Sequence, residues 1–341
     1  MSIQKEITMF DQTRRSILRI AAAGGGLSML GSTAWAQGAP KLSQAKVVTG
    51  FPAGDMIDTI ARTFAEKLKG NYADVVLVDN KPGAGGRLAA TALKGQPADG
   101  ATILFTPAPI VTLYPHVFSS LAYDPMKDLT PVARTSVAAF ALSVGPAVPD
   151  SVKTLGQFLD WCRANPDKAS YGTSGAGTTI HMTGANLARL SGVPLTMIPY
   201  KGGSLAANDL IAGQVPAVMS TVPSVMEFVK AGKARFLAVS SPQRWPGLPD
   251  VPTFAESGFP QLTNLDWFGV FLPANASRVQ INQLHAAVVK AAQAPDVAAL
   301  FNRIGIQLSP SASPEEFAKQ VRDDYAQWGQ VVKAVGFKPL D

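Results

Sequence analysis

The stretch "KVVTGFPAGDMIDTIARTFAEKLKGNYADVVLVDN", residues 46–80, decides the fold class of this chain. Its two ends, 46–51 and 74–80, are rich in valine, as strands often are. Between them, residues 57–70 repeat apolar side chains at helical spacing and stop at Gly70. A strand, a helix and a second strand in this order predict a βαβ unit whose strands lie parallel in one sheet.

The same alternation starts again after a β-rich passage at about 133–144, and a second such passage follows at about 265–273. Both passages have the place of crossover strands between two α/β units, and the helical C-terminal part would return to cover the first unit. We therefore predict two lobes, each with a mixed, mainly parallel sheet flanked by helices. The first lobe takes residues 37–138 and 262–341 and the second takes 139–261, with a ligand between them.

The first 36 residues indicate an export signal rather than a part of the fold. Paired Arg14 and Arg15 precede a short apolar stretch rich in Ala and Gly, and an A-x-A site ends at Ala36. This order is typical of a twin-arginine signal. A retained membrane anchor is the alternative, but three consecutive glycines interrupt a segment too short to span a bilayer comfortably. We therefore predict a mature protein in the periplasm.

Composition narrows the class of partner. The formal net charge is +6 at pH 7 and no block of Lys or Arg stands out, so we expect no nucleic-acid partner. One cysteine, Cys162, cannot form an internal disulfide and fits a small buried residue on a helix. The three histidines, His116, His181 and His285, lie far apart in the sequence, so we predict neither a metal site nor a cofactor.

A glycine-rich loop, "YGTSGAGTTIH" at residues 171–181, stands between a predicted strand and a predicted helix. The start of a helix leaves amide N–H groups unpaired and carries partial positive charge, and glycines let the backbone approach an anion closely. Thr173, Ser174, Thr178 and Thr179 add hydroxyl donors without bulk. The loop lacks the lysine of a Walker motif and the last glycine of G-x-G-x-x-G, so it predicts an anion site rather than a nucleotide site.

Ser174 offers an alternative, an exported serine hydrolase with His181 as its base. The segment "GTSGA" departs from the G-x-S-x-G elbow, because Ala176 has the place of the second glycine, and no acid stands out to orient the histidine. His181 either forms local hydrogen bonds on its helix or lines the cleft, and both readings stay open. We predict that the protein is not an enzyme and has no catalytic residue.

Two acids stand at the start of the helix over 57–70. Asp55 and Asp58 are three residues apart, which fits helix capping more simply than acid–base chemistry. Capping is the simpler role for Asp58, whereas the role of Asp55 is less clear.

Two further pairs of residues have alternative roles. Tyr200 and Lys201 follow a predicted strand, where either can donate to a carboxylate or where the lysine is simply solvated beside a turn. Trp267 and Phe268, on the late strand, fit core or hinge packing, with an apolar wall of the cleft as the alternative.

Several segments occur in the order found in one known family. They are "DNKPGAGG" (79–86), "DLTPVA" (128–133), the glycine loop, "PYKGG" (199–203), "LPDVPTFAESG" (248–258) and "WFGVFLP" (267–273). Together they resemble the solute receptors of the tripartite tricarboxylate transporters, also called Bug proteins. The resemblance spans nearly the whole chain after residue 36, and the combination is specific although each segment alone is weak.

The resemblance implies a two-lobed fold of periplasmic-binding-protein type II. Such a receptor is exported, closes on a small organic carboxylate and hands it to a pair of membrane permease subunits. We expect a monomer. A receptor that signals to a sensor protein is a further alternative.

The resemblance also implies a binding site made of loops from both lobes. The carried-over residues are Phe51, Ala53, Gly54, Asp55 and Met56 in the first loop, Ser174, Gly175, Gly177, Thr178, Thr179 and His181 in the glycine loop, and Tyr200, Lys201, Gly202, Gly203 and Thr221 beyond it.

This chain departs from the family pattern at four positions. Asp55 stands where a glycine is usual and Met56 where a small polar residue is common, while Pro216 and Ser220 stand where the family often has acids. An inward-pointing Asp55 would repel a nearby carboxylate and favour a monocarboxylate with a neutral or cationic end. An Asp55 that caps the helix from outside would leave the usual carboxylate pose intact. The sequence leaves both orientations open.

Overall fold

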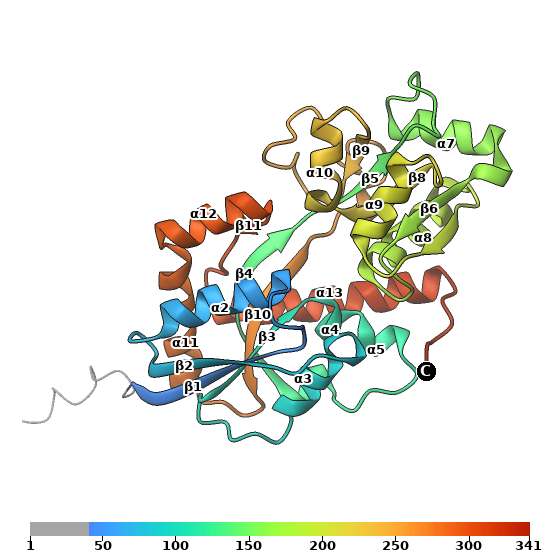
Figure 1. Cartoon of the computed structure of the whole chain (residues 1–341). Coiled ribbons are helices and arrows are strands. Elements are labelled where there is room, and N and C mark those ends of the chain that lie inside the picture. Colours follow the sequence, from blue (N-terminus) through green and yellow to red (C-terminus); the bar gives the residue numbers. More distant parts are fainter. Residues whose placement is uncertain (1–40) are drawn as a thin grey trace, which may run out of the picture. The chain divides into compact units, whose positions relative to one another are not determined.

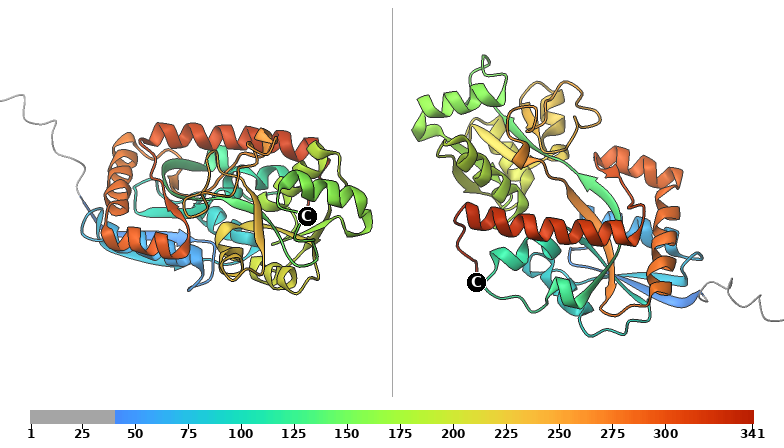
Figure 2. Two further views of the ribbon diagram at one scale, coloured as in Figure 1. Left: turned by 90° about the horizontal axis from the view of Figure 1, so that it is seen from above. Right: turned by 180° about the vertical axis from the view of Figure 1, so that it is seen from behind.

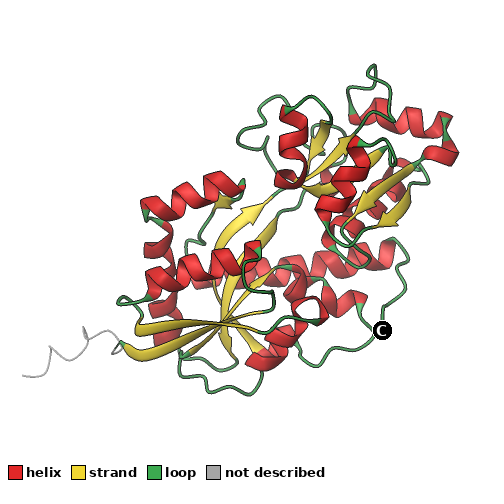
Figure 3. Cartoon of the chain, in the orientation of Figure 1, coloured by secondary structure: helices red, strands yellow, loops and turns green. Residues whose placement is uncertain are grey.

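The computed structural model of this chain describes residues 41–341, and the export signal expected at residues 1–36 lies outside them. The described chain forms two α/β lobes, each with its own mixed sheet (Figures 1 and 3). We call them the larger lobe and the smaller lobe, after sheets of six and five strands. The predicted fold class is confirmed, whereas the residue ranges assigned to each lobe stay a prediction.

The sheet of the larger lobe has the strand order β11-β4-β10-β3-β1-β2. Strand β1 is parallel to β2 and β3, whereas β10 is antiparallel to β3 and β4, and β11 is antiparallel to β4. The predicted βαβ unit is therefore present as β1, helix α2 and β2. The bounds are β1 (Leu42–Thr49), α2 (Met56–Leu68), β2 (Ala73–Asn80), β3 (Thr102–Pro107), β4 (Leu129–Ala138), β10 (Asp266–Pro273) and β11 (Gln307–Leu308).

The sheet of the smaller lobe has the order β7-β6-β8-β5-β9. Strand β6 is parallel to β7 and β8, whereas β5 is antiparallel to β8 and β9. The bounds are β5 (Phe140–Val144), β6 (Ser170–Thr173), β7 (Thr196–Pro199), β8 (Ala217–Thr221) and β9 (Arg235–Val239). Its helices are α7 (Leu155–Ala164), α8 (Thr179–Ser191), α9 (Gly203–Ile211) and α10 (Val222–Lys230), with the short 3₁₀ turns η2 (Pro166–Lys168) and η3 (Pro260–Leu262).

The C-terminal helices return to the larger lobe, as predicted. Helix α11 packs on α2 and β4, and α13 packs on β4 and α4 while its far part also contacts α8 of the smaller lobe (Figure 2). The short helices α4, α5 and α6 were not predicted, because four residues are too few to show a helical period. The remaining helices are η1 (Ala84–Gly86), α3 (Arg87–Leu93), α4 (Pro109–Thr112), α5 (Tyr114–Val117), α6 (Pro125–Asp128), α11 (Arg278–Ala292), α12 (Pro295–Ile304) and α13 (Pro314–Ala334).

Two crossovers join the lobes. The β-rich passage at 133–144 is two strands, since β4 ends at Ala138 in one sheet and β5 begins at Phe140 in the other. The return crossover enters β10, whose first residue, Asp266, pairs with Ala138. Both links between the lobes therefore meet at one end of the β4–β10 ladder.

The segment 79–86 packs against the loop that follows β1 and donates a hydrogen bond to it. The Asn80 side chain donates hydrogen bonds to the Phe51 carbonyl at 2.9 Å and to the Asp58 carboxylate at 2.7 Å. Gly86 has φ +92°, a conformation that side chains rarely adopt, and it lies against the Phe51 ring. The absence of a side chain at Gly86 thus lets the Phe51 ring pack closely against the backbone, which fixes the position of Phe51.

We expect Gly86→Ala to lower the free energy of unfolding by roughly 3 kcal/mol, because left-handed strain and overpacking add. An added Cβ would meet Ile110 Cδ1 at 2.5 Å and Phe51 Cε2 at 3.2 Å. Gly95→Ala is the matched control, since Gly95 has φ +77° with nothing within 4 Å, and it should lose only about 1 kcal/mol. Urea unfolding measures both values, and equal losses would contradict the packing argument.

Candidate functional site

A cavity of about 200 Å³ is lined by residues of both lobes. None of the lining residues is Lys, Arg or His, and only Tyr114 and Asp266 carry side chains that ionise. A negatively charged ligand would therefore meet neutral donors here. The lining residues are Phe51, Met56, Ile57, Pro107, Pro109, Tyr114, Ala138, Asp266, Phe268 and Ile306 from the larger lobe, and Ser174, Thr178, Thr179, Ile180, Thr221 and Pro223 from the smaller lobe.

Three helices, α2, α8 and α10, begin at this cavity, and α8 offers the clearest pair of amides. On α2 the Asp55 carboxylate already accepts from the Ile57 amide. On α10 the Val222 amide donates to the Ala139 carbonyl, and Pro223 has no N–H. The first amide groups of a helix lack intrahelical acceptors and carry partial positive charge, which suits an anion. On α8 the Thr178 hydroxyl accepts from the His181 amide at 3.2 Å, and the Thr178 carbonyl accepts from Met182 at 3.0 Å. The amides of Thr179 and Ile180 come before these bonds, and both residues line the cavity.

The hydroxyl groups of the smaller lobe differ in whether they already have a protein partner. Thr178 donates to the Gly175 carbonyl at 3.0 Å, and Thr221 shares a hydrogen bond of 2.8 Å with Ser224. Ser174 is half-buried, lines the cavity, and makes no side-chain hydrogen bond within residues 41–341. Its hydroxyl is therefore available to a ligand.

The larger lobe contributes an acid, Asp266, which is the first residue of β10 and is half-buried. Its Oδ1 atom is buried and has no hydrogen-bond partner in the described part of the chain. Burial raises the pKa of Asp266 to about 7; a hydrogen bond from the Trp267 amide lowers it, and the negative charge of Asp324 adds to the rise. Burial likewise raises the pKa of Asp324 to about 6 and raises the pKa of Tyr114, where Asp266 adds to the shift.

The structure brings only some of the sequence-predicted site residues to this cavity. Those that line it are Phe51, Met56, Ser174, Thr178, Thr179 and Thr221. The others lie outside its lining: Ala53, Gly54, Asp55, Gly175, Gly177, His181, Tyr200, Lys201, Gly202 and Gly203.

Several of the residues outside the lining have local partners. The Asp55 carboxylate accepts from the Ile57 amide at 2.8 Å as the N-cap of α2, so of its two orientations the structure has the capping one. His181 Nδ1 accepts from the Gly177 amide at 3.1 Å, and burial lowers the pKa of this histidine. The Tyr200 hydroxyl donates to the Asp209 carboxylate at 2.8 Å. Each of these side chains is engaged away from the cavity.

Two aromatic residues that the sequence treated alike have different places. Trp267 is fully buried in the core and its indole N–H donates to Asp324 at 2.7 Å, whereas Phe268 lines the cavity. Cys162 is buried on α7, as predicted, and burial raises its pKa to about 12.

Sequence reasoning missed nine lining residues. Only Asp266 gave a signal, as a lone charge directly before the apolar run "WFGVFLP". The missed residues are Ile57, Pro107, Pro109, Tyr114, Ala138, Ile180, Pro223, Asp266 and Ile306.

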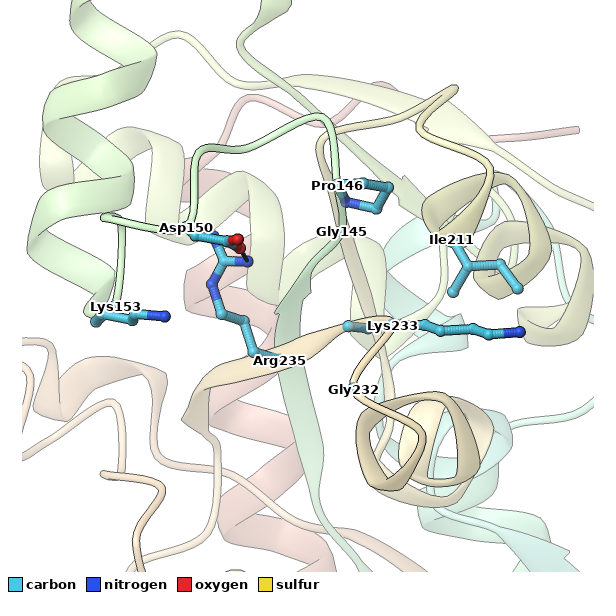
Figure 4. A pocket seen from close by; sticks show the side chains of 9 residues that line it. Gly145, Pro146, Asp150, Lys153, Ile211, Gly232, Lys233 and Arg235 are labelled. Carbon is cyan, nitrogen blue, oxygen red and sulfur yellow. Dashed lines mark hydrogen bonds and ion pairs between the residues drawn. The ribbon is translucent and has the colours of Figure 1, made fainter.

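A second cavity, of about 720 Å³, lies on the smaller lobe alone (Figure 4). Its Arg235 guanidinium already donates to three backbone carbonyls, of Val148, Pro149 and Val152, and pairs with Asp150 at 3.3 Å. Figure 4 shows this pair beside the Lys153 and Lys233 side chains. The Arg235 guanidinium is thus already bound by protein groups, and residues of only one lobe line this second cavity. We therefore place the candidate site in the cavity that both lobes line.

Ser174 has no hydrogen bond to a histidine within residues 41–341, so the geometry lacks the nucleophile–base pair that a serine hydrolase needs. Among the same residues, no helix combines the length and the apolar character needed to cross a membrane.

Known proteins resemble the chain in sequence and in fold. Residues 60–337 match a family model described as the tripartite tricarboxylate transporter family receptor. Protein BugT of Bordetella pertussis is 30% identical over 298 residues, which cover 86% of this chain and 89% of that protein. Rpa4515 of R. palustris, solved with adipate, has 30% identity and a TM-score of 0.74, covering 87% of this chain and 98% of that one. MatC (Rpa3494) from Rhodopseudomonas palustris with bound malate has 27% identity and a TM-score of 0.70, covering 85% and 98%.

We expect Asp266→Asn to stabilise the unliganded protein above pH 7 by on the order of 2 kcal/mol. The folded state holds a proton on Asp266 up to about pH 7, whereas an unfolded aspartate releases it near 3.8. The folded state thus binds more protons in this window, so the wild-type protein loses stability as the pH rises through it.

Urea unfolding from about pH 4.5 to 8 measures this difference, which should shrink toward the acidic end. Asp323→Asn is the control, because it removes an equal charge from an exposed position of α13. Parallel stability curves for Asp266→Asn and the wild type would contradict the assignment.

Proposed function

Because this chain belongs to the tripartite tricarboxylate transporter receptor family, we propose that it captures a small organic carboxylate in the cavity between its lobes. The observation that supports this most is the start of α8 at a cavity that both lobes line, where the Thr179 and Ile180 amides precede the first bonds of the helix and no basic side chain is in the lining. Helix starts hold anions through backbone amides and partial charge, with no need for Lys or Arg.

The proposed ligand carboxylate binds the amides of Thr179 and Ile180 and the hydroxyl of Ser174. These groups are neutral donors, and the Ser174 hydroxyl has no other partner within residues 41–341. A cavity of about 200 Å³ suits a small acid. Relatives solved with adipate and with malate support the same ligand class.

Capture would proceed by closure of the lobes about the two crossovers. A ligand that touches both lobes stabilises the closed arrangement by its differential affinity for it. We propose that the exported receptor acts in the periplasm as a monomer, after a twin-arginine signal is removed, and that it delivers the acid to the permease subunits of a tripartite transporter.

Mass spectrometry of the small acid that copurifies with the native protein tests the ligand class directly. Adipate, malate, succinate and citrate then serve as calorimetric probes. If none of these acids binds and no carboxylate copurifies, the proposal fails.

We expect Ser174→Ala to weaken carboxylate binding by about tenfold or more, because a hydrogen bond to a charged group is lost. Isothermal titration calorimetry measures the change in Kd. Ser170→Ala is the matched control, since Ser170 is half-buried at the start of β6, the strand that leads to Ser174, and lies outside the cavity lining. Hydrolysis of an ester by the wild type that Ser174→Ala abolishes would instead identify a hydrolase.

A further inference from the structure

Asp266 is the only carboxylate in the lining of the cavity. It lies where the two crossovers meet, paired with Ala138 at the end of the β4–β10 ladder. Its Oδ1 atom is buried and has no partner within residues 41–341. A buried carboxylate oxygen without a hydrogen bond is costly, so this group calls for an explanation.

No cation of the described chain neutralises Asp266. The groups that act on it electrostatically are Asp324 of α13 and Tyr114 of α5, an acid and a phenol. The guanidinium groups that act electrostatically on Asp324 and Tyr114 are held by other partners. Arg134 donates to the Ser309 carbonyl at 2.7 Å and to Gln320, and Arg87 lies 3.7 Å from the centre of the Phe118 ring.

The two walls of the cavity therefore differ in chemistry. The smaller lobe presents the start of α8 and the Ser174 hydroxyl, which donate hydrogen bonds and attract negative charge. The larger lobe presents a carboxylate oxygen, which accepts a hydrogen bond and repels negative charge. A ligand group that donates a hydrogen bond to Asp266 removes the cost of its burial, and a second ligand carboxylate at that place increases it.

We propose that Asp266 determines ligand specificity by accepting a hydrogen bond from a hydroxyl or ammonium group that the ligand carries away from its bound carboxylate. The inference rests on the proposed function and narrows its ligand class to hydroxy acids and amino acids whose donor is remote from the bound carboxylate. Asp266 would thus repel a second carboxylate and favour a neutral or cationic end of the ligand, which is the role that the sequence analysis considered for an inward-pointing Asp55.

Two matched series of straight-chain acids test the proposal by calorimetry at about pH 8. The six-carbon series is caproate, ε-hydroxycaproate, ε-aminocaproate and adipate, and the four-carbon series is butyrate, γ-hydroxybutyrate, γ-aminobutyrate and succinate. In at least one series the wild type should bind the hydroxy or amino acid about tenfold or more tightly than the unsubstituted acid and the diacid.

Asp266→Asn should bind the amino acid about tenfold more weakly than the wild type and should bind the diacid at least as tightly. Asp323→Asn, with an equal loss of charge outside the cavity, should retain the wild-type preferences. A second measurement needs no variant. As the pH falls from 8 to about 6, Asp266 takes up a proton, so diacid binding to the wild type should strengthen and amino-acid binding should weaken.

The outcomes separate the two proposals. If the wild type prefers the diacid or the unsubstituted acid at about pH 8, or if Asp266→Asn keeps the wild-type preference, the role of Asp266 is refuted and the receptor function stands. If no member of either series binds, the inference is refuted; if, in addition, neither malate nor citrate binds and no carboxylate copurifies with the protein, the proposed function falls as well.

Discussion

The antiparallel pairing of β4 with β10 is the constraint on which the site depends. These two strands carry both crossovers, and their ladder ends where Ala138 meets Asp266. Asp266 and Phe268 are two residues apart on β10, so their side chains point to the same face of the sheet, and both line the cavity together with Ala138. The same pairing holds the start of the smaller lobe one residue beyond the larger sheet. The helix starts of both lobes are thereby brought to one place.

Helix α13 reinforces this junction from the other side of the ladder. Phe317 packs edge-on against Trp267, with ring centres 5.0 Å apart, and Asp324 accepts from the Trp267 indole. Farther along, Trp328 and Val332 join an apolar cluster that includes Met182 of α8. One helix therefore contacts the crossover strand and both lobes, so the cavity floor is packed on its far side by a rigid element.

Much of the fold could be predicted because its signals are local. A strand, a glycine turn and a periodic helix each show themselves within about a dozen residues, and the order of such units fixes the lobes. The glycine loop before α8 could be placed at a cavity for the same reason. The short helices α4, α5 and α6 could not be predicted, because four residues are too few to show the helical spacing of apolar side chains.

The rest of the site could not be predicted, because long-range pairing decides which side chains face the cavity. Asp55 was a candidate for the inward acid, yet it finds the Ile57 amide two residues away. His181 and Tyr200 are likewise engaged by Gly177 and Asp209. The Trp267 amide reaches the Asp266 carboxylate but leaves Oδ1 without a partner within residues 41–341. The place of Asp266 at the cavity follows from the register of β10 on β4, which a single sequence does not reveal. A polar side chain with a capping partner close by is thus a weak candidate for a ligand contact.

The position of Asp266 at the crossover links recognition to closure. A ligand shifts the lobes toward the closed arrangement only by the difference between its affinities for the closed and the open states. The start of α8 offers its amides to any carboxylate, so it distinguishes small acids poorly. Asp266 is dehydrated where the lobes meet, and a ligand that leaves its oxygen unpaired there gains less from closure, although its own carboxylate is held equally well. The group remote from the bound carboxylate would then decide selectivity, because the Oδ1 atom of Asp266 is buried and lacks a partner within residues 41–341.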